Sequence, residues 1–358
     1  MSDDRVSIVI DGHEWTHWNE LELHLSLDSH ATAGFNAPFE PERRAFRDTF
    51  RPFSFKDVVV YVDGERLFTG TLVDVKPNTD AGSRTVSVSC YSKAAILEDC
   101  CPPSELAPVE ANGLTLRQIA ERLAAPFGIE VAMTAADGAP FKRVNSRQRR
   151  ANNKAEQDQS IQDFLVDLAR QRGLVITSDP DGALLFTRSV APGHPVVRLE
   201  EGVPPLLSVT PTFSPQSYFD EITGFTSAKR GRLGSKYTER VERLSGGALR
   251  TLSFRLDDIE KADAVGAVRA KMARMFANIV QYVVGVPTWR DPEGTLFRPN
   301  TTLTLKAPGA MVYHDTELLL RDVYLKTSAN ERTASIGLVL PGAFSGEQPP
   351  LPLPWEDA

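Results

Sequence analysis

The feature that most constrains the fold is a strict alternation of leucine with polar residues near the N-terminus. Leucines at positions 21, 23, 25 and 27 are separated by Glu22, His24 and Ser26. Alternate side chains of a β-strand point to opposite faces, so this pattern is typical of a strand with one buried face. The segment therefore predicts a half-buried strand and a sheet to which it belongs.

Further short strands follow the same logic over the first hundred residues. Asp11-Gly12 and Asp63-Gly64 are strong hairpin signals, and a polar turn lies at 77–82. The predicted strands are 6–10, 21–27, 58–62, 72–75 and 86–90. Many short strands separated by turns favour a small sandwich or barrel.

The middle of the chain has a mixed pattern after a proline-containing linker at 102–108. Residues 115–125 predict an amphipathic helix, followed by a strand at 129–133. Ser160 can cap a second helix, and a hairpin at 174–177 and 183–187 follows it. Two helix–strand units are therefore expected between about 105 and 195.

Strand patterns return in the last part of the chain. The predicted strands are 206–209, 218–226, 282–286, 301–306, 318–326 and 333–340, and the strongest helical periodicity covers 257–280. The predicted class is α+β, mainly β, with two related β-barrel domains and smaller α+β parts. The expected domains are 1–104 (first barrel), 105–195 (α+β), 196–345 (second barrel with an inserted helix at about 257–280) and 346–358 (a proline-rich C-terminal tail).

Two segments of the chain resemble each other. Residues 58–91 and 303–340 both read as strand, turn, strand, polar turn and strand. Val73 to Lys76 matches 323–326, and 84–88 matches 332–336. Any two hairpins share some of this pattern. The alternative is two related barrels, which would give a trimer six similar modules in a closed ring.

Composition excludes several classes of protein. The net charge of −7 does not favour a nucleic-acid binder, which needs a basic surface. The chain has three cysteines, Cys90, Cys100 and Cys101. Because the number is odd and two of them are adjacent, no disulfide framework is expected. The N-terminus lacks the apolar core of a signal peptide, and no apolar run reaches the ~20 residues of a membrane span. We expect a soluble, non-exported chain without membrane insertion.

Candidate chemical residues are few. His13 and His17 are four apart but lack a third metal ligand. A glycosidase needs two carboxylates at a set separation in one cleft. The carboxylates that could form such a pair are Glu40, Glu42, Asp48, Asp57 and Asp63. No phosphate-binding loop or nucleophile elbow is present. We therefore predict no catalytic, cofactor-binding or metal-binding residues, no cofactor, and no enzymatic activity.

Three other features have both structural and functional interpretations. The basic stretch 142–158, with arginines at 147, 149 and 150, could bind nucleic acid but is expected to be a solvated or partner-contact loop. Cys100-Cys101 is expected to be structural. The polyproline-like segment 349–355 could dock on a partner's aromatic groove, although a loose or strand-like extension is preferred.

The order of these parts resembles a known family. The segments that carry the resemblance are 6–12, 67–73, 86–100, 161–165, 182–188 and 294–300. Together they are similar to the Mu-like phage tail protein P family, the baseplate hub of contractile tails. The resemblance covers nearly the whole chain, but its motifs are loose.

The resemblance implies a homotrimeric ring with two barrels per chain, related to the T4-like hub and to the hub part of type VI secretion spikes. Its implied partners are a trimeric spike, hexameric tail-tube proteins and other baseplate proteins, around a channel that passes DNA without specific binding. The implied location is the virion tail baseplate, assembled in the host cytoplasm. The absence of an obvious spike or lysozyme domain implies a separate spike. The alternatives are a tail-associated cell-wall hydrolase and a peptidoglycan-binding module.

Overall fold

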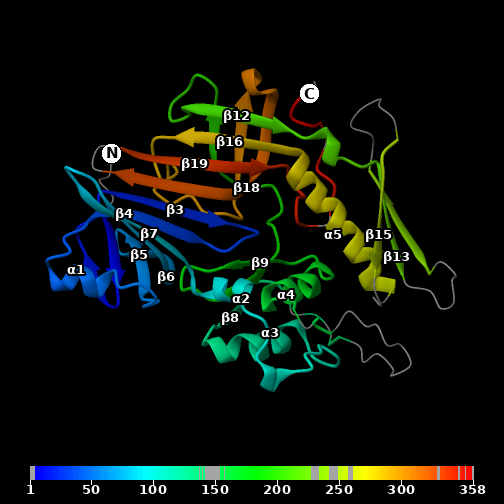
Figure 1. Cartoon of the computed structure of the whole chain (residues 1–358). Helices are drawn as coiled ribbons and strands as arrows, with labels where there is room; N and C mark the ends of the chain where they lie inside the picture. The colour runs from blue at the N-terminus through cyan, green and yellow to red at the C-terminus, as the bar shows by residue number, and fades with distance from the viewer. Residues whose placement is uncertain are drawn as a thin grey trace.

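A computed structural model describes residues 5–136, 138, 140–141, 154–156, 158–226, 234–241, 249–256, 261–328, 331–345, 347–350 and 352–356. A broad β-sheet forms the body, an α+β region lies below it, and α5 leads to a smaller sheet at one side (Figure 1). The helices are α1 (Arg44–Thr49), α2 (Ile96–Asp99), α3 (Leu116–Ala124), α4 (Ile161–Arg170) and α5 (Lys261–Ile279). Short 3₁₀ turns lie at Lys93–Ala95, Ser104–Leu106, Ala125–Phe127, Pro215–Ser217 and Pro308–Ala310.

The large sheet contains 13 strands in the described part of the chain. They are β1 (Val6–Ile10), β2 (His13–Trp15), β3 (Glu20–Ser26), β4 (Thr32–Pro38), β5 (Asp57–Val62), β6 (Glu65–Thr79), β7 (Arg84–Ser92), β11 (Pro195–Glu200), β12 (Ser208–Phe213), β16 (Val280–Val286), β17 (Thr302–Ala307), β18 (Val312–Ser328) and β19 (Arg332–Val339). The order is β12-β16-β19-β18-β3-β4-β7-β6-β5-β1-β2, and β17 links β11 to β18. The predicted half-buried strand is β3, which lies at the centre.

Two halves of this sheet have the same pairing order. The first β unit runs β1-β5-β6-β7-β4-β3, and the second runs β11-β17-β18-β19-β16-β12. A bulge interrupts β6 between Leu72 and Asp74, and another interrupts β18 between Leu320 and Asp322. The units differ in one pair, since β1 is antiparallel to β5 whereas β11 is parallel to β17. The similarity predicted between 58–91 and 303–340 is therefore found in the strand pairing.

The register corrects one part of that predicted match. Val75 pairs with Val88, and Val323 pairs with Ile336, so Val75 corresponds to Val323. The sequence similarity alone matches Val73 with Val323, two positions away. A shift of two residues keeps every side chain on the same face of a strand, so the apolar pattern cannot distinguish the two matches.

The prediction of two barrels is not confirmed. Both β regions share one sheet because β3 pairs with β18, and no closed barrel is found among the described strands. One hydrophobic core also spans both units, including Ile8, Phe35, Tyr282 and Leu338. The mainly β class with smaller α+β parts is confirmed. The division at 104, 195 and 345 stays a prediction.

The α+β region has a separate hydrophobic core. Leu116, Ile119 and Leu123 from α3 pack with Phe164 and Leu168 from α4. Both predicted helix starts are confirmed: Thr115 forms a capping box with Gln118, and the Ser160 side chain accepts from the Asp163 backbone. Strands β8 (Val131–Met133), β10 (Leu184–Thr187) and β9 (Val175–Ser178) form the sheet of this region.

The long helix α5 packs on a three-stranded sheet. That sheet is β14 (Lys236–Arg240), β13 (Glu221–Thr226) and β15 (Thr251–Leu256). The predicted helix 257–280 is confirmed over 261–279, and 257–260 lie outside the described residues. Gly224 is required where the layers meet, because a Cβ there would overlap Leu256 and Val268. None of the described helices has the length and apolar character needed to cross a membrane.

The C-terminal tail packs against the body. Leu353 is buried, and the Tyr313 backbone N–H donates to the Pro354 carbonyl at 2.9 Å. The Trp355 ring meets Phe213 edge to face, with 5.5 Å between centroids. The preferred expectation of a loose or strand-like extension is therefore wrong. Burial of Leu353 and the Trp355 ring contact stabilise the docked position.

Candidate functional site

The joint between the two β units is a polar network across β3 and β18. Asp322 accepts from His24 Nε2 at 3.1 Å, and the His24 ring stacks on Tyr324 with centroids 4.1 Å apart. Arg321 donates two hydrogen bonds to Asp28, at 2.9 and 3.0 Å. Such bidentate pairs fix geometry as well as adding energy. The residues at the β18 bulge therefore hold the first β unit in register with the second.

The electrostatic environment of this joint favours the ionised carboxylate of Asp322. Burial opposes ionisation of Asp322, but hydrogen bonds from His24 and Ser26 and the nearby Arg321 guanidinium outweigh it. The pKa of Asp322 is consequently held below its ordinary value. Both Arg321 and Asp322 are only partly exposed, so water screens their interactions less than at an open surface.

A second group of ion pairs joins the β5–β6 turn to the second β unit. Arg290 Nη2 lies 2.8 Å from Asp63 Oδ2, and Arg298 pairs with Glu65. Exposed pairs contribute only about 0–1 kcal/mol each. These ion pairs therefore mainly fix the relative orientation of the two β units. The β3–β18 strand pairing supplies most of the free energy that holds the units together.

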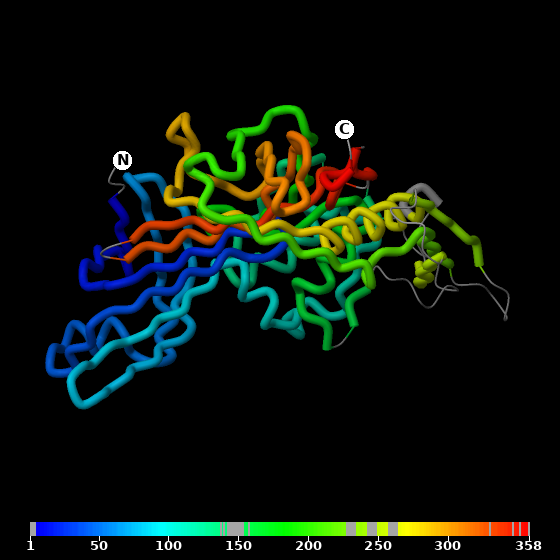
Figure 2. Tube along the Cα trace, turned by 90° about the horizontal axis from the view of Figure 1, so that it is seen from above, coloured from blue at the N-terminus to red at the C-terminus, as the bar shows by residue number. Residues whose placement is uncertain are grey.

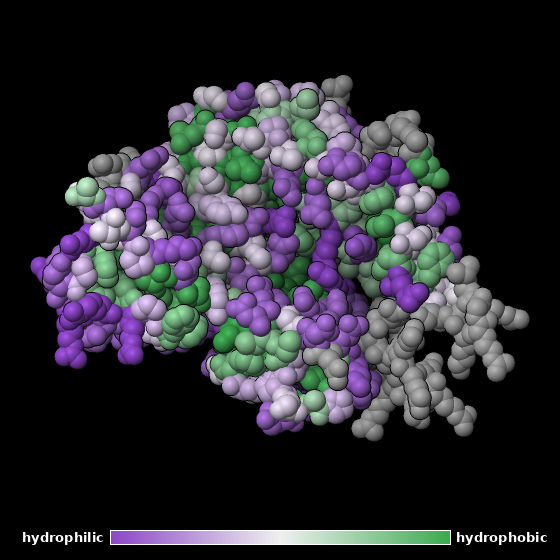
Figure 3. Space-filling model, viewed as in Figure 1, coloured by the Kyte–Doolittle hydropathy of each residue, from purple (hydrophilic) through white to green (hydrophobic). Residues whose placement is uncertain are grey.

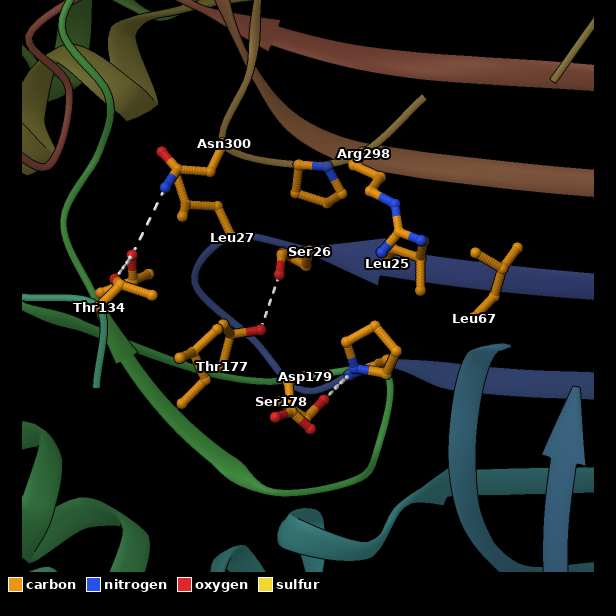
Figure 4. A pocket seen from close by; sticks show the side chains of 15 residues that line it. Leu25, Ser26, Leu27, Leu67, Thr134, Thr177, Ser178, Asp179, Arg298 and Asn300 are labelled. Carbon is orange, nitrogen blue, oxygen red and sulfur yellow. Dashed lines mark hydrogen bonds between the residues drawn. The ribbon is translucent and has the colours of Figure 1, made fainter. Parts of the chain in front are cut away.

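A pocket of about 290 Å³ lies where three parts of the chain meet (Figure 4). Leu25 and Leu67 come from the first β unit, Thr177 and Asp179 from the α+β region, and Asn300 from the second β unit. All of these are labelled in the figure, together with other lining residues. The pocket is therefore built by the junction itself.

The polar groups of this pocket serve the junction. Thr177 Oγ1 lies 2.7 Å from both the Ser26 and Ser29 carbonyls, and Asn300 Nδ2 donates to Arg188 O at 2.9 Å. Burial raises the pKa of Asp179, whose carboxylate caps the β9–β10 turn by accepting from Ala183 N at 2.8 Å. These contacts tie chain segments together and place no nucleophile beside a base.

The five carboxylates considered for a glycosidase site each have a cation beside them. The contacts are Glu40–Arg43 at 2.6 Å, Glu42–Arg84 at 2.5 Å, Asp48–Arg44 at 3.2 Å, Asp57–Lys93 at 3.0 Å and Asp63–Arg290 at 2.8 Å. A glycosidase acid needs a raised pKa, whereas the backbone amide and Arg84 lower the pKa of Glu42. This arrangement does not favour a hydrolase.

The aromatic and histidine segment 13–18 packs as a surface hairpin. Trp15 meets Phe46 and Phe50 edge to face at 5.0 and 5.1 Å, and its Nε1 donates to His17 O at 2.8 Å. Within the ranges that the structure describes, no group of three or more His, Cys, Asp or Glu residues is placed to hold a metal. The prediction of no metal-binding residues stays a prediction.

The cysteines and the basic stretch complete the predicted candidates. Cys90, Cys100 and Cys101 are all free thiols. Burial raises the pKa of Cys90 to about 12 and also raises that of Cys100, so neither is activated as a nucleophile. The arginines of the 142–158 stretch lie outside the described residues.

The face seen in Figure 3 carries interspersed hydrophobic and hydrophilic side chains, with small hydrophobic groups near the α1 end and over the α+β region. Contiguous exposed apolar patches mark interaction sites, so these two groups are candidates for contact with a partner. The most exposed aromatic among the described residues, Phe53, lies in the loop after α1, and sequence reasoning missed it.

Sequence reasoning also missed the β3–β18 joint, although the sequence contains a signal for it. Three leucines at 318–320 followed by Arg321-Asp322 break the alternation, as a bulge does.

This chain is similar in sequence to known baseplate hub proteins. Residues 94–188 match the family model of the second domain of gp44-like baseplate hub proteins. The baseplate hub protein gp44 of Escherichia phage Mu is 24% identical over 340 residues, which are 89% of this chain and 83% of the Mu protein. The resemblance to Mu-like tail proteins is confirmed.

Solved structures agree with this Mu-like assignment. The 43 kDa tail protein of prophage MuSo2 from Shewanella oneidensis is 25% identical, with a TM-score of 0.79 over 95% of this chain and 99% of that protein. The E. coli c3393 protein is described as a type VI secretion component similar to T4 gp27 and gp5. It shares the fold at 10% identity, with a TM-score of 0.58 over 96% of this chain and 79% of that protein. This chain is thus a relative of phage baseplate hub proteins.

Proposed function

We propose that this chain is a structural subunit of a phage-type baseplate hub, and that three copies form a ring. The observation that carries the proposal is the repeated pairing order of the two β units, each with a bulge at the corresponding place. Three copies with two similar units each present six similar modules. Such a ring adapts a six-fold tail tube to a three-fold spike.

The relatives support this proposal. The similarity to Mu gp44 extends over 89% of the chain and so includes both β units. On this basis the partners are a trimeric spike protein, hexameric tube proteins and other baseplate proteins, and the location is the baseplate of a virion tail. The central channel passes DNA without specific binding, and the subunit acts through its surfaces with no reaction of its own.

The first test is the mass of the purified chain in solution. Sedimentation velocity across micromolar concentrations should show a species of three times the 39.4 kDa chain mass. Class averages of that species in the electron microscope should show a three-fold ring with six similar lobes. A ring with another number of copies would contradict the proposal.

The second test uses particles. Deleting the gene for this chain should leave tails without a complete baseplate, and the intact chain supplied in trans should restore it. Normal tails from the deletion strain would refute a hub function, whatever the chain does in solution.

A further inference from the structure

The loop that follows α1 displays two phenylalanines to solvent. Phe53 is 92% exposed and Phe55 is 60% exposed. Both have left-handed backbone conformations, with φ of 58° and 46°. A left-handed conformation costs a residue with a bulky side chain roughly 1–2 kcal/mol. Phe53 is almost fully exposed and Phe55 is more than half exposed, so their own packing offsets little of this cost and the rest of the loop holds them in place.

The base of this loop is firmly built. Phe46 and Phe50 of the preceding segment are buried and enclose the Trp15 ring. Ser54 Oγ donates to the Arg51 carbonyl at 2.8 Å, which closes the turn between the two exposed rings. A preorganised aromatic loop loses little conformational entropy on binding, and aromatic anchors dominate many protein interfaces.

The surroundings of the loop are positively charged. Arg47 and Arg51 are exposed, and in the described part of the chain neither has an ion-pair partner. The neighbouring Arg44 already pairs with Asp48. A partner of this loop should therefore offer an apolar recess with an excess of negative charge beside it.

A recess of that kind lies beside the C-terminal tail. It has a volume of about 420 Å³ and includes Pro341, Pro350 and Pro354 in its wall, with Asp315 and Glu317 beside them. Arg198 is shared between Asp315 and Glu200, and Glu317 accepts from the Gly193 backbone at 2.7 and 2.9 Å. Lys306 Nζ also lies 4.0 Å from Glu200 Oε1, so Arg198 and Lys306 together neutralise Asp315 and Glu200. Among the described residues Glu317 has no cation within ion-pair distance, and its carboxylate leaves the rim acidic.

The loop and the recess lie on separate parts of the molecule. Figure 1 shows α1 at the end of the first β unit, and the C-terminus beyond the second β unit on the other side. Figure 2, seen from above, shows the same separation. The loop therefore cannot reach the recess of its own chain, whereas a second copy placed head to tail can bring the two together.

We propose that the 51–56 loop of one copy inserts Phe53 and Phe55 into the proline-lined recess of a second copy. This contact rests on the proposed ring and gives it a specific interface. Proline and phenylalanine faces supply apolar contact, while Arg47 and Arg51 meet the rim that carries Asp315 and Glu317. Because the two surfaces are different, the contact is heterologous, and its repetition closes the proposed ring when successive copies are related by one third of a turn.

The first experiment compares a double variant, Phe53→Ser with Phe55→Ser, with a control, Leu249→Ser. Leu249 is 65% exposed and lies outside the loop and the recess. Sedimentation over a concentration series should show at least about 100-fold weaker assembly of the double variant, with an unchanged circular dichroism spectrum and melting temperature. The control should assemble like the parent chain. Equal assembly of all three would overturn the proposed contact.

The second experiment tests the recess directly. In a background with Cys100→Ser and Cys101→Ser, the pair Phe55→Cys and Pro350→Cys should form a disulfide between copies when diamide oxidises the two thiols. The pair Phe55→Cys and Leu249→Cys should not. A trimeric parent that neither responds to the serine variants nor cross-links would refute the contact and leave the ring standing. A parent that is monomeric throughout would refute both.

Discussion

A buried histidine should make the stability of this protein fall on mild acidification. His30, between β3 and β4, is 4% exposed, and neither ring nitrogen has a hydrogen-bond partner. The nearest carboxylate oxygen, Glu98 Oε1, is 4.0 Å from Nε2. Burial lowers the pKa of His30 from 6.5 to about 4, and the nearby Gln162 side chain opposes the shift only in part.

The magnitude follows from proton linkage. Between pH 6.5 and 4 the unfolded chain binds a proton at this histidine and the folded chain does not. Stability is therefore unaffected by His30 above pH 6.5 and falls as the pH drops toward 4. At about 1.4 kcal/mol per pKa unit, the loss reaches about 3 kcal/mol. That is a large part of the 5–15 kcal/mol typical of a folded domain.

The assay is urea unfolding of the parent chain and of His30→Phe at pH 7, 6, 5 and 4.5. Other groups titrate in both proteins, so the quantity of interest is the difference between the two pH dependences. The parent should lose about 2 kcal/mol more than the variant between pH 7 and 5. His194→Phe, at an exposed position, should behave like the parent. Parallel curves for the parent and His30→Phe would refute the reasoning.

Three other predictions concern packing, the joint and the thiols. Arg321→Ala should lower the free energy of unfolding by about 1–3 kcal/mol in denaturant titrations, because Asp28 loses both hydrogen bonds; full stability would disprove the joint. Gly224→Ala should cost about 1–3 kcal/mol, whereas Gly82→Ala, with open space around it, should be nearly neutral in the same assay. Cys101 should react with a thiol reagent in the native protein and Cys90 only after unfolding; rapid labelling of Cys90 would contradict its burial.

The proposed ring gives the β3–β18 joint a specific importance. If the two units of a chain changed their relative position, six similar modules would no longer lie on one circle. The paired charges at Asp28, Arg321 and Asp322, with the ladder beneath them, resist such movement. Weakening this joint should therefore make the positions of the modules in the assembled ring more variable before the chain unfolds.

Local features of this protein were determined by the sequence alone. The alternation at 21–27 predicts a half-buried strand, and the structure has β3 there. The amphipathic pattern of 115–125 predicts α3, and Ser160 predicts the start of α4, since capping depends on residues three positions apart. Strand β4 was missed, because its buried face is built from Ala33, Phe35 and Ala37, where small residues weaken the apolar signal.

Long-range features were decided only by the tertiary structure. His24 and Asp322 meet although they are 298 positions apart, and that pairing merges two predicted barrels into one sheet. An alternating strand shows which face is buried but is compatible with many neighbours, so its partner depends on the whole sheet. Burial of His30 and docking of Trp355 follow in the same way, since each depends on surfaces assembled from distant segments.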